Sequence, residues 1–426
     1  MTINEALEFI HSVSWMGSTL GLHRINELMQ RLGAPVMNGI IHIAGTNGKG
    51  STASMLASIL KAAGYKTGLY TSPFIFRFNE RMQINGESIS DNELAELTEQ
   101  VRPHALAMED RPREFELVTA IAALYFTKHK CDYVVFEAGM GGELDATNFV
   151  QSPVCSVITA IGLDHVQELG DTLPEIARTK AGIIKPGCDT VLYNQSQDVM
   201  DVFAGVCREK NSNLTITEPD RIQSISDSIK GQTFTYRNSP EYTIRLLGVH
   251  QLRNAATALE VIDVLRRRGA EISADAVYDG LLCTRWPARF EVVMTKPYFI
   301  IDGGHNPQCA ETIRANIKKY FPDNKIIFLI GILKDKDITG LTDIINDVAW
   351  EYVTIKPDSP RAMAETELAQ FLQEHYNKPA YPCATVSQGV NKAIKLAGEQ
   401  DIICAAGSLY SVGDIQAAVD NYLAGI

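Results

Sequence analysis

The stretch Ile40-Ile41-His42-Ile43-Ala44-Gly45-Thr46-Asn47-Gly48-Lys49-Gly50-Ser51-Thr52 decides the fold of this chain. A short apolar run ends in a glycine-rich turn, and helix-like sequence follows from Ala53 to Leu60. A strand, a glycine loop and a helix in this order form a phosphate cradle, because backbone N–H groups and the positive end of the helix point at the anion. The stretch therefore predicts a nucleoside triphosphate site. Its expected contacts are Thr46, Asn47, Gly48, Lys49, Gly50, Ser51 and Thr52.

The chemistry of this loop depends on one cation and one hydroxyl. Lys49 adds a mobile positive charge against the phosphates, and the Ser51 hydroxyl at the helix start is placed to bind the accompanying Mg²⁺. The loop departs from the usual pattern G-x-x-x-x-G-K-[ST], because Ile43 replaces the first glycine and Gly50 separates Lys49 from Ser51. The alternative is an ordinary tight turn before a helix.

Length and composition describe a globular protein with more than one domain. The chain has 426 residues, of which 45% are apolar and 21% charged. Its net charge of −12 argues against nucleic-acid or anionic-membrane partners, so an anionic substrate must be met by local cations. The eight cysteines form no C-x-x-C pair, which favours free thiols in a reducing compartment. The N-terminus does not resemble a signal peptide and no apolar run could span a bilayer. We expect a cytoplasmic monomer.

Strand-like and helix-like segments alternate along the chain, which predicts an α/β fold with a mostly parallel sheet covered on both faces. In the first part, the expected strands are 39–46, 65–71, 133–138, 154–161 and 190–193, with a small antiparallel addition at 232–236 and 242–246. After a proline-bearing stretch the alternation starts again and predicts a smaller Rossmann-like domain with five or so strands. We place an ATP-binding domain at 1–285, a linker at 286–297 and a C-terminal domain at 298–426. A cleft between two such domains is the usual place for a ligand.

Three further segments carry groups that suit nucleotide chemistry. Glu137 ends an apolar strand and precedes glycines, where a doubly wound sheet presents a metal ligand or catalytic acid; the alternative is a turn-capping carboxylate. Asp164-His165 follows another strand, and the alternative for it is a helix cap beside a surface histidine. Lys180 lies in a helical pattern, where a lysine is ordinarily a solvated residue.

Several motifs, in the same order along the chain, resemble those of the Mur ligase superfamily. The loop G-T-N-G-K-[GST]-[ST] is similar to its phosphate loop, and Gly50 resembles the branch of the folylpolyglutamate and dihydrofolate synthases. The block 71–86 resembles T-S-P-H-L-x-x-F-x-E-R-I-x-I-N-G of that branch, with Phe74 where histidine is common. Further matches are E-x-G-x-G-G-x-x-D-x-T-N at 137–148, the K-A-G of 180–182, G-x-H-Q-x-x-N-A at 248–255, P-G-R-x-E at 287–291, D-G-A-H-N-P at 302–307 and G-S-L-Y at 407–410. Ala288 replaces the glycine of one motif and Gly304 the alanine of another.

The resemblance implies roles for residues that the chain alone leaves open. Metal ligands would be Ser51, Ser72, Glu137 and His165, holding two Mg²⁺ ions, with a monovalent cation as a further candidate. Lys180 would be carbamylated by CO₂ and support the second metal, which requires a neutral amine and hence a lowered pKa. In the nucleotide site, Asn254 would lie near the adenine, Arg289 at a phosphate, Asp302 on the ribose side and His305, a catalytic candidate with Lys49, near the transferring phosphoryl group.

For the acid substrate, the resemblance points to Arg81 as a bidentate carboxylate clamp, the alternative being a surface salt bridge with Glu80. The pterin would lie near three segments: residues 21–24, Phe115-Glu116 and Leu144-Asp145-Ala146. The second departs from the usual F-F-E because Glu114 precedes Phe115.

The implied activity is ATP-dependent ligation of L-glutamate to dihydropteroate, to a reduced folate, or to both, through an acyl phosphate. An acyl phosphate hydrolyses readily, so closure of the smaller domain is expected to exclude water. Two alternatives remain: a peptidoglycan-type amino-acid ligase, and a nucleotide-gated binding protein on a phosphate-loop fold. Gly50 and the block 71–86 disfavour the first, and the carboxylate, histidine and lysine motifs disfavour the second.

Overall fold

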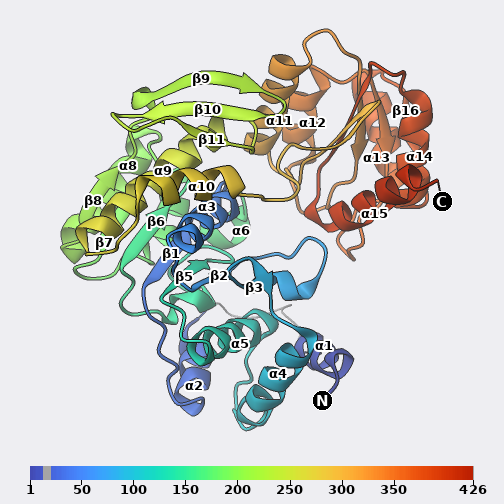
Figure 1. The fold of residues 1–426 in the computed structure, drawn as a ribbon. Coiled ribbons are helices and arrows are strands. Elements are labelled where there is room, and N and C mark those ends of the chain that lie inside the picture. The colour runs from blue at the N-terminus through green and yellow to red at the C-terminus, as the bar shows by residue number, and fades with distance from the viewer. Residues whose placement is uncertain (13–20, 426) are drawn as a thin grey trace. The chain divides into compact units, whose positions relative to one another are not determined.

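The computed structural model describes residues 1–12 and 21–425, which form two compact units. The first unit comprises residues 1–225, 233–244 and 251–284, and the second comprises 226–232, 245–250 and 285–426. The main division falls between Thr284 and Arg285, next to the expected junction at 285. Two short stretches of the expected first domain therefore pack with the second unit. Figure 1 shows the elements of both.

The first unit is built on an eight-stranded sheet with the order β4-β3-β2-β5-β1-β6-β7-β8. All neighbours from β2 to β8 pair in parallel, and β3 and β4 add an antiparallel edge. Apolar side chains on both faces bury the central strands, as expected for a parallel sheet covered twice. The strands are β1 (Ile40–Ala44), β2 (Thr67–Tyr70), β3 (Met82–Ile84), β4 (Glu87–Ser88), β5 (Tyr133–Glu137), β6 (Cys155–Ile158), β7 (Asp189–Leu192) and β8 (Asn213–Ile216).

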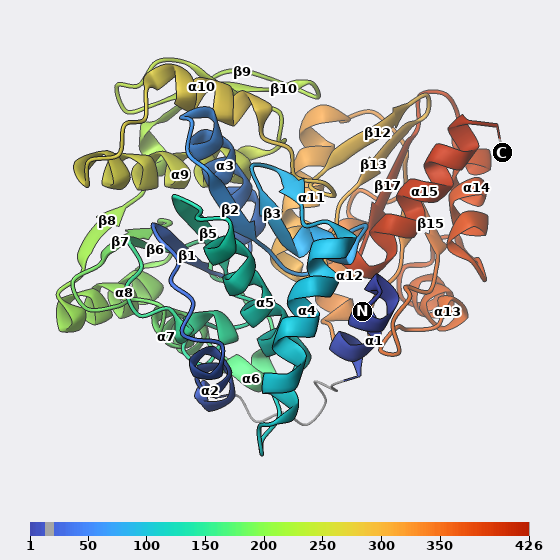
Figure 2. The ribbon, with the colours of Figure 1, turned by 60° about the horizontal axis from the view of Figure 1, so that its bottom comes forward.

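Helices cover both faces of this sheet. Figures 1 and 2 show α3, α9 and α10 on one face and α2, α4 and α5 on the other. The helices of this part of the chain are α1 (Ile3–His11), α2 (His23–Arg31), α3 (Lys49–Ala62), α4 (Asp91–Leu106), α5 (Glu114–Lys128), α6 (Val166–Leu169), α7 (Leu173–Ala181), α8 (Gln197–Lys210), α9 (Val249–Arg267) and α10 (Ala274–Cys283). None of the helices in the described ranges is long and apolar enough to cross a membrane.

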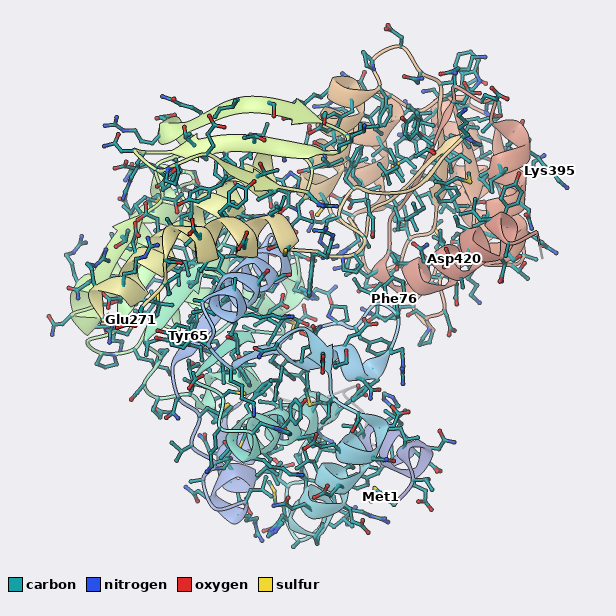
Figure 3. All side chains as sticks on the ribbon, in the orientation of Figure 1. Met1, Tyr65, Phe76, Glu271, Lys395 and Asp420 are labelled. Carbon is teal, nitrogen blue, oxygen red and sulfur yellow. The ribbon has the colours of Figure 1, made fainter. Side chains whose placement is uncertain are left out.

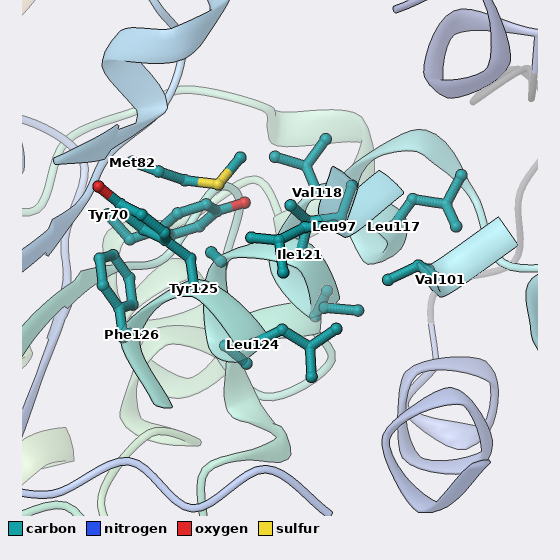
Figure 4. Close-up of a cluster of buried hydrophobic side chains, with 14 of the residues drawn as sticks. Tyr70, Met82, Leu97, Val101, Leu117, Val118, Ile121, Leu124, Tyr125 and Phe126 are labelled. Carbon is teal, nitrogen blue, oxygen red and sulfur yellow. The ribbon is translucent and has the colours of Figure 1, made fainter. Parts of the chain in front are cut away.

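A large apolar core lies between the sheet and helices α1, α2, α4 and α5. Figure 4 shows part of it, where Tyr70 of β2 and Met82 of β3 meet Tyr125 and Phe126 of α5. Tyr70 also stacks on Phe136 of β5, with 4.7 Å between the ring centroids. These contacts fix β2 and β5, the two strands whose ends carry candidate site residues.

Three short strands form a separate sheet in the order β11-β10-β9. They are β9 (Ile222–Ser228), β10 (Gly231–Tyr236) and β11 (Tyr242–Ile244). The expected strands at 232–236 and 242–246 correspond to β10 and β11. The connections between them, residues 229–230 and 237–241, are as short as those that join antiparallel neighbours.

The second unit contains a six-stranded sheet with the order β12-β13-β17-β14-β15-β16. Its strands pair in parallel except β12, which runs antiparallel to β13. They are β12 (Glu291–Thr295), β13 (Tyr298–Ile301), β14 (Ile326–Ile330), β15 (Glu351–Thr354), β16 (Ala380–Pro382) and β17 (Ile402–Ala406). The helices are α11 (Pro307–Tyr320), α12 (Ile338–Asn346), α13 (Glu365–Tyr376), α14 (Val386–Leu396) and α15 (Val412–Leu423). The segment 286–297, expected as a linker, thus contains the edge strand β12.

Candidate active site

The phosphate loop connects β1 to α3 as its sequence predicts. Gly48 is the N-cap of α3 and has a φ of 88°, a conformation that costs a side chain about 1–2 kcal/mol. A Cβ at this position would lie 2.7 Å from the Asn254 Oδ1 atom, so only glycine lets α9 approach the loop this closely. The Asn254 amide donates to Gln251 Oε1 (3.1 Å), and the Gln251 amide donates to Ser51 Oγ (3.3 Å). Asn254 therefore lies against the loop.

The first two residues of the loop are fastened to the strand beside it. The backbone N–H groups of Thr46 and Asn47 both donate to the Ala160 carbonyl oxygen, at 2.8 and 3.1 Å. The Thr46 hydroxyl donates to the carbonyl of Gly162 (3.0 Å) and accepts from its N–H (3.1 Å). These amide groups are already used within the protein. The groups best placed for a phosphate are therefore the N–H groups of the first turn of α3, which have no partner within the helix.

Two lysine side chains meet at one backbone oxygen. Lys49 Nζ lies 3.1 Å and Lys180 Nζ 3.0 Å from the Gly45 carbonyl oxygen. Lys180 is only 4% exposed, so the alternative of a solvated helix residue is wrong. Burial, together with the charge of Lys49, lowers the pKa of Lys180 to about 7, which a neutral amine at physiological pH requires. Gly142 permits this packing, because a Cβ there would lie 2.7 Å from the Lys180 carbonyl oxygen.

Two candidate metal ligands lie at the carboxyl ends of neighbouring strands. Glu137 ends β5, is 4% exposed, and accepts a hydrogen bond from the N–H of Ser72 (3.3 Å), which follows β2. Ile43, the penultimate residue of β1, is level with Glu137 in the parallel register. Along this edge of the sheet the order is therefore the phosphate loop, then Glu137, then Ser72.

These oxygen groups fit Mg²⁺, which typically takes one or two protein carboxylates and completes its shell with phosphates and water. In residues 1–12 and 21–425, no three His, Cys, Asp or Glu side chains gather into a metal cage of their own. A nucleotide-borne ion would draw on Glu137 with the hydroxyls of Ser51 and Ser72. His165 is exposed at the start of α6 with a φ of 51°, and its metal role stays a prediction from the resemblance.

Arg81 lies at the same edge, just before the antiparallel strand β3. Its backbone carbonyl accepts from the N–H of Thr71 (3.1 Å), which brings it beside the loop that carries Ser72. The expected alternative, a salt bridge with Glu80, is wrong. Glu80 instead accepts from the backbone N–H groups of the preceding turn, those of Ile75, Phe76 and Arg77. Glu80 therefore does not form an ion pair with the Arg81 guanidinium.

The three segments expected near a pterin do come together, through α2, α5 and the short helix η2 (Ala146–Phe149). Two of their acidic residues are occupied within the protein. Glu116 pairs with the buried Arg24 (3.0 Å) and accepts from the N–H of Arg113 at the start of α5 (2.7 Å). Asp145 accepts from the N–H groups of Met140 (2.8 Å) and Thr147 (3.0 Å). These contacts favour structural roles for both carboxylates.

Two apolar members of these segments, Leu144 and Phe115, are more accessible to a ligand. Leu144 is 45% exposed, whereas Ala146, two residues later, is buried. The half-buried Phe115 ring packs against Gly139, two residues after Glu137, and lies 6.1 Å from the ring of Tyr70. Phe115 therefore connects the expected pterin region with the strand that carries the metal candidate.

The second unit holds Arg289, Asp302 and His305 in one small region. Asp302 follows β13 and accepts from the N–H groups of Phe290 (2.9 Å) and Gly304 (2.7 Å). Burial raises the pKa of its carboxyl group, an effect that the nearby Arg289 opposes. His305 Nδ1 lies 3.0 Å from the Gly303 carbonyl oxygen. The N–H of Gly407 donates to the Gly304 carbonyl (2.9 Å), so the D-G-G-H and G-S-L-Y motifs are adjacent.

Both departures from the motifs of this unit have structural consequences. Ala288, which replaces glycine, has a φ of 54° and is fully buried. Its conformation is held from both sides, because its N–H donates to Glu291 (2.9 Å) and its carbonyl accepts from Gly303 (2.9 Å). At Gly304, which replaces alanine, a Cβ would lie 2.8 Å from the Cβ of Cys309. Glycine at 304 therefore leaves room for the first turn of α11, where Cys309 lies.

Comparisons with known proteins place the chain in a family. Its residues 43–262 match the Mur ligase middle domain, and residues 288–409 match the glutamate ligase domain of the Mur ligases. The chain therefore belongs to the Mur ligase family of ATP-dependent ligases. Within that family, the relatives that it matches include bifunctional dihydrofolate synthase/folylpolyglutamate synthases and a protein named only as a folylpolyglutamate synthase.

The dihydrofolate synthase/folylpolyglutamate synthase of Bacillus subtilis strain 168 is 34% identical over 428 residues, covering 97% of this chain and 98% of that protein. The structure of Escherichia coli FolC with DHPP and ADP superposes with a TM-score of 0.87 at 29% identity, covering 99% of both chains. The Yersinia pestis bifunctional enzyme, solved with AMPPNP and a Mn ion, gives a TM-score of 0.84 at 29% identity, covering 99% of this chain and 98% of that one. These matches confirm the predicted fold class and enzyme class.

Sequence reasoning missed some residues that position the site. Gln251, which connects Asn254 to Ser51, lies in the quoted H-Q motif, and its spacing of three residues from Asn254 on a helix could have revealed it. The pairing of Arg24 with Glu116 joins positions 92 residues apart, and no local pattern signals it.

The lowered pKa of Lys180 predicts a pH-dependent stability. Because the folded value of about 7 lies below the ordinary value, the unfolded chain binds more protons between these two pH values, and stability rises with pH across that window. In CO₂-free buffer, Lys180→Met should be more stable than the wild type by on the order of a few kcal/mol near neutral pH, with the gain shrinking toward pH ~10. Urea unfolding at several pH values measures this. A difference that does not vary with pH would contradict it, and Lys61→Met on the exposed face of α3 is the control.

Proposed function

We propose that this protein joins the amino group of L-glutamate to the carboxylate of dihydropteroate and of reduced folates, with ATP as the energy source. The observation that carries the proposal is the order of groups along one edge of the first sheet. The phosphate loop follows β1, Glu137 ends β5, Ser72 follows β2 and Arg81 precedes β3. A nucleotide phosphate, a metal ion and an acceptor carboxylate would occupy that edge in the same order.

In the first step the acceptor carboxylate oxygen attacks the γ-phosphorus of ATP, and ADP leaves. Lys49 and the N–H groups at the start of α3 neutralise the phosphates, while Arg81 holds the carboxylate in line. Mg²⁺ on Glu137 would neutralise charge that develops on the bridging oxygens. In the second step the glutamate amine attacks the acyl carbon, phosphate leaves, and the amine loses a proton.

Lys180 is proposed to act as a carbamate. Its amine attacks CO₂, a proton is released, and the side chain changes from a cation to an anion. The burial of Lys180 and its lowered pKa supply the neutral amine that this reaction needs. The product would remove the repulsion between two ammonium groups that share the Gly45 carbonyl oxygen.

Further parts of the proposal rest on family resemblance. Asn254 would lie near the adenine, Arg289 would contact a phosphate, Asp302 would address the ribose side and His305 would lie near the phosphoryl group. Two divalent-ion sites, with His165 at the second, and a monovalent cation complete the set. We propose that the enzyme is a cytoplasmic monomer without nucleic-acid or membrane partners.

The peptidoglycan-type alternative has less support, because the relatives described above are folate enzymes. A nucleotide-gated binding protein would leave the buried Lys180 and the carboxylate at Glu137 without a purpose. The family also places this chain among ligases.

Loss of Lys49 tests the nucleotide site. Lys49→Ala removes a charge that acts on the transferring phosphoryl group, and the chemical step should slow by roughly a hundredfold or more. ADP release with saturating acceptor and glutamate measures this, and circular dichroism confirms folding. Lys61→Ala, an exposed lysine on the same helix, should retain full activity. A folded Lys49→Ala enzyme with most of its activity would exclude the assignment.

Chemical rescue tests the carbamate. Lys180→Ala should be nearly inactive and should recover part of its activity with added acetate or formate, because a short carboxylate can occupy the vacated space. Lys49→Ala should show no such recovery. If carboxylic acids leave Lys180→Ala unchanged while wild-type activity is insensitive to CO₂ removal, Lys180 is not carbamylated.

Acceptor choice is tested by glutamate-dependent ADP release with dihydropteroate and with a tetrahydrofolate in parallel. Both present a carboxylate to the same acyl-phosphate chemistry, so dihydropteroate should stimulate ADP release at least as well as the folate does. Activity with folates alone would make the protein a dedicated polyglutamate synthase.

A further inference from the structure

Arg81 is a buried cation without a protein anion. Its side chain is 9% exposed, and its Nε atom is buried with no hydrogen-bond partner. In the described ranges, no carboxylate forms an ion pair with it. An isolated buried charge is costly, so a guanidinium held in this state indicates an anionic ligand.

Two phenylalanine rings hold this guanidinium in place. The Arg81 Cζ atom lies 5.5 Å from the Phe74 ring centroid and 5.2 Å from that of Phe78, and the two rings are 5.8 Å apart. Because these three distances are nearly equal, the Cζ atom and the two ring centroids form a nearly equilateral triangle. Both rings therefore lie on the same side of the guanidinium. They form a shelf beneath it and leave its other edges for a ligand. Cation–π attraction of this kind strengthens when water is excluded.

The two rings differ in what else they do. Phe78 is 6% exposed and belongs to the core beneath the sheet, so it is needed for folding. Phe74 is 37% exposed, and its ring contacts are with Phe78 and Arg81. Phe74 is therefore the part of the shelf that serves the guanidinium more than the core. It also stands where the resembling motif carries histidine.

The position of the shelf identifies the anion. Glu137 and Ser72 lie between the phosphate loop and Arg81 along the sheet edge. The phosphate loop at the end of β1 would bind the ATP phosphates. The anion that Arg81 binds, beside β3, is then the acceptor carboxylate to which the γ-phosphoryl group is transferred. The half-buried Phe115 ring, which packs against Gly139 just beyond Glu137, suits an acceptor that carries an aromatic ring.

We propose that Phe74 is a positioning residue for the acceptor carboxylate: it holds the Arg81 guanidinium in the orientation that binds this group. The proposal rests on the proposed function, since it concerns the acid substrate of that reaction. By orienting Arg81, Phe74 strengthens the preference of the acceptor site for a carboxylate over a neutral group. It does not contribute to nucleotide binding.

The test compares binding of dihydropteroate with binding of its carboxamide analogue, in the presence of Mg²⁺ and a non-hydrolysable ATP analogue. The wild type should prefer the carboxylate by about tenfold or more. Phe74→Leu should reduce this preference to about threefold or less, and Phe74→Tyr should retain it. Phe76, labelled in Figure 3, is a 44% exposed phenylalanine of the same loop, and Phe76→Leu is the matched control that should change nothing.

Two further measurements separate positioning from general damage. In Phe74→Leu the KM for the acceptor should rise about three- to tenfold, while the KM for ATP and kcat stay within about twofold. Arg81→Met should lose the preference for carboxylate, and adding Phe74→Leu to it should have no further effect on that preference.

Equal losses for carboxylate and carboxamide, or a rise confined to the KM for glutamate, would overturn the proposal. So would a Phe74→Leu enzyme that keeps the wild-type preference. Absence of glutamate-dependent turnover by the wild type with every pterin acceptor would instead overturn the proposed function, so the two failures are distinguishable.

Discussion

The parallel pairing of β2, β5 and β1 is the constraint on which the candidate site depends. In this register Tyr70 is level with Phe136, and Ile43 is level with Glu137, so the three strands end within one residue of one line, at the level of Glu137. The phosphate loop begins directly after β1, Glu137 is the last residue of β5, and Ser72 is the second residue after β2. A slip of one residue in β5 would turn Glu137 to the opposite face and place Phe136 at the line. The aromatic core of Tyr70, Phe126 and Phe136 resists such a slip, which links the packing of α5 to the chemistry at the edge.

Local positive charge allows this edge of the sheet to attract anions although the chain as a whole is acidic. The net charge of −12 would repel ATP and a carboxylate substrate at long range. Along the sheet edge, however, Lys49 and Lys180 share one carbonyl oxygen and Arg81 lies just before β3, all three in a partly or wholly buried setting. Burial lowers the pKa of Lys180, and no carboxylate of the described residues forms an ion pair with Arg81. Such unfavourable arrangements persist at functional sites because a ligand compensates for them.

The sequence predicted the fold well where apolar runs were long and buried on both faces. The runs at β1, β2, β5 and β6 were of this kind. Edge strands were harder. The strands β8, β12 and β16 are short or partly exposed, and their residues lack the continuous apolar pattern of a central strand. The segment 286–297 therefore seemed a linker although it includes β12.

For the site, motifs located the right segments but not the use of each side chain. Glu116 and Asp145 lie where the sequence placed them, yet hydrogen bonds within the protein occupy their carboxylates. The amides of Thr46 and Asn47 are likewise occupied by the Ala160 carbonyl. Whether a polar group faces a ligand or a neighbour depends on contacts between residues far apart in the chain. A local pattern carries no information about those contacts.

The departures from the motifs show how the same geometry is kept with different residues. Ala288 adopts a left-handed conformation that glycine would enter freely, at a cost of about 1–2 kcal/mol, because hydrogen bonds on both sides fix the turn before Arg289. Gly304 leaves room for Cys309 where alanine would collide with it. In these two cases the neighbours preserve the backbone that the motif requires. Phe74 differs from both, because its change alters the chemistry offered to a ligand: an apolar ring, unlike an imidazole, neither titrates nor competes with Arg81 for an anion. In our proposal, packing against two phenylalanine rings orients the Arg81 guanidinium for the substrate.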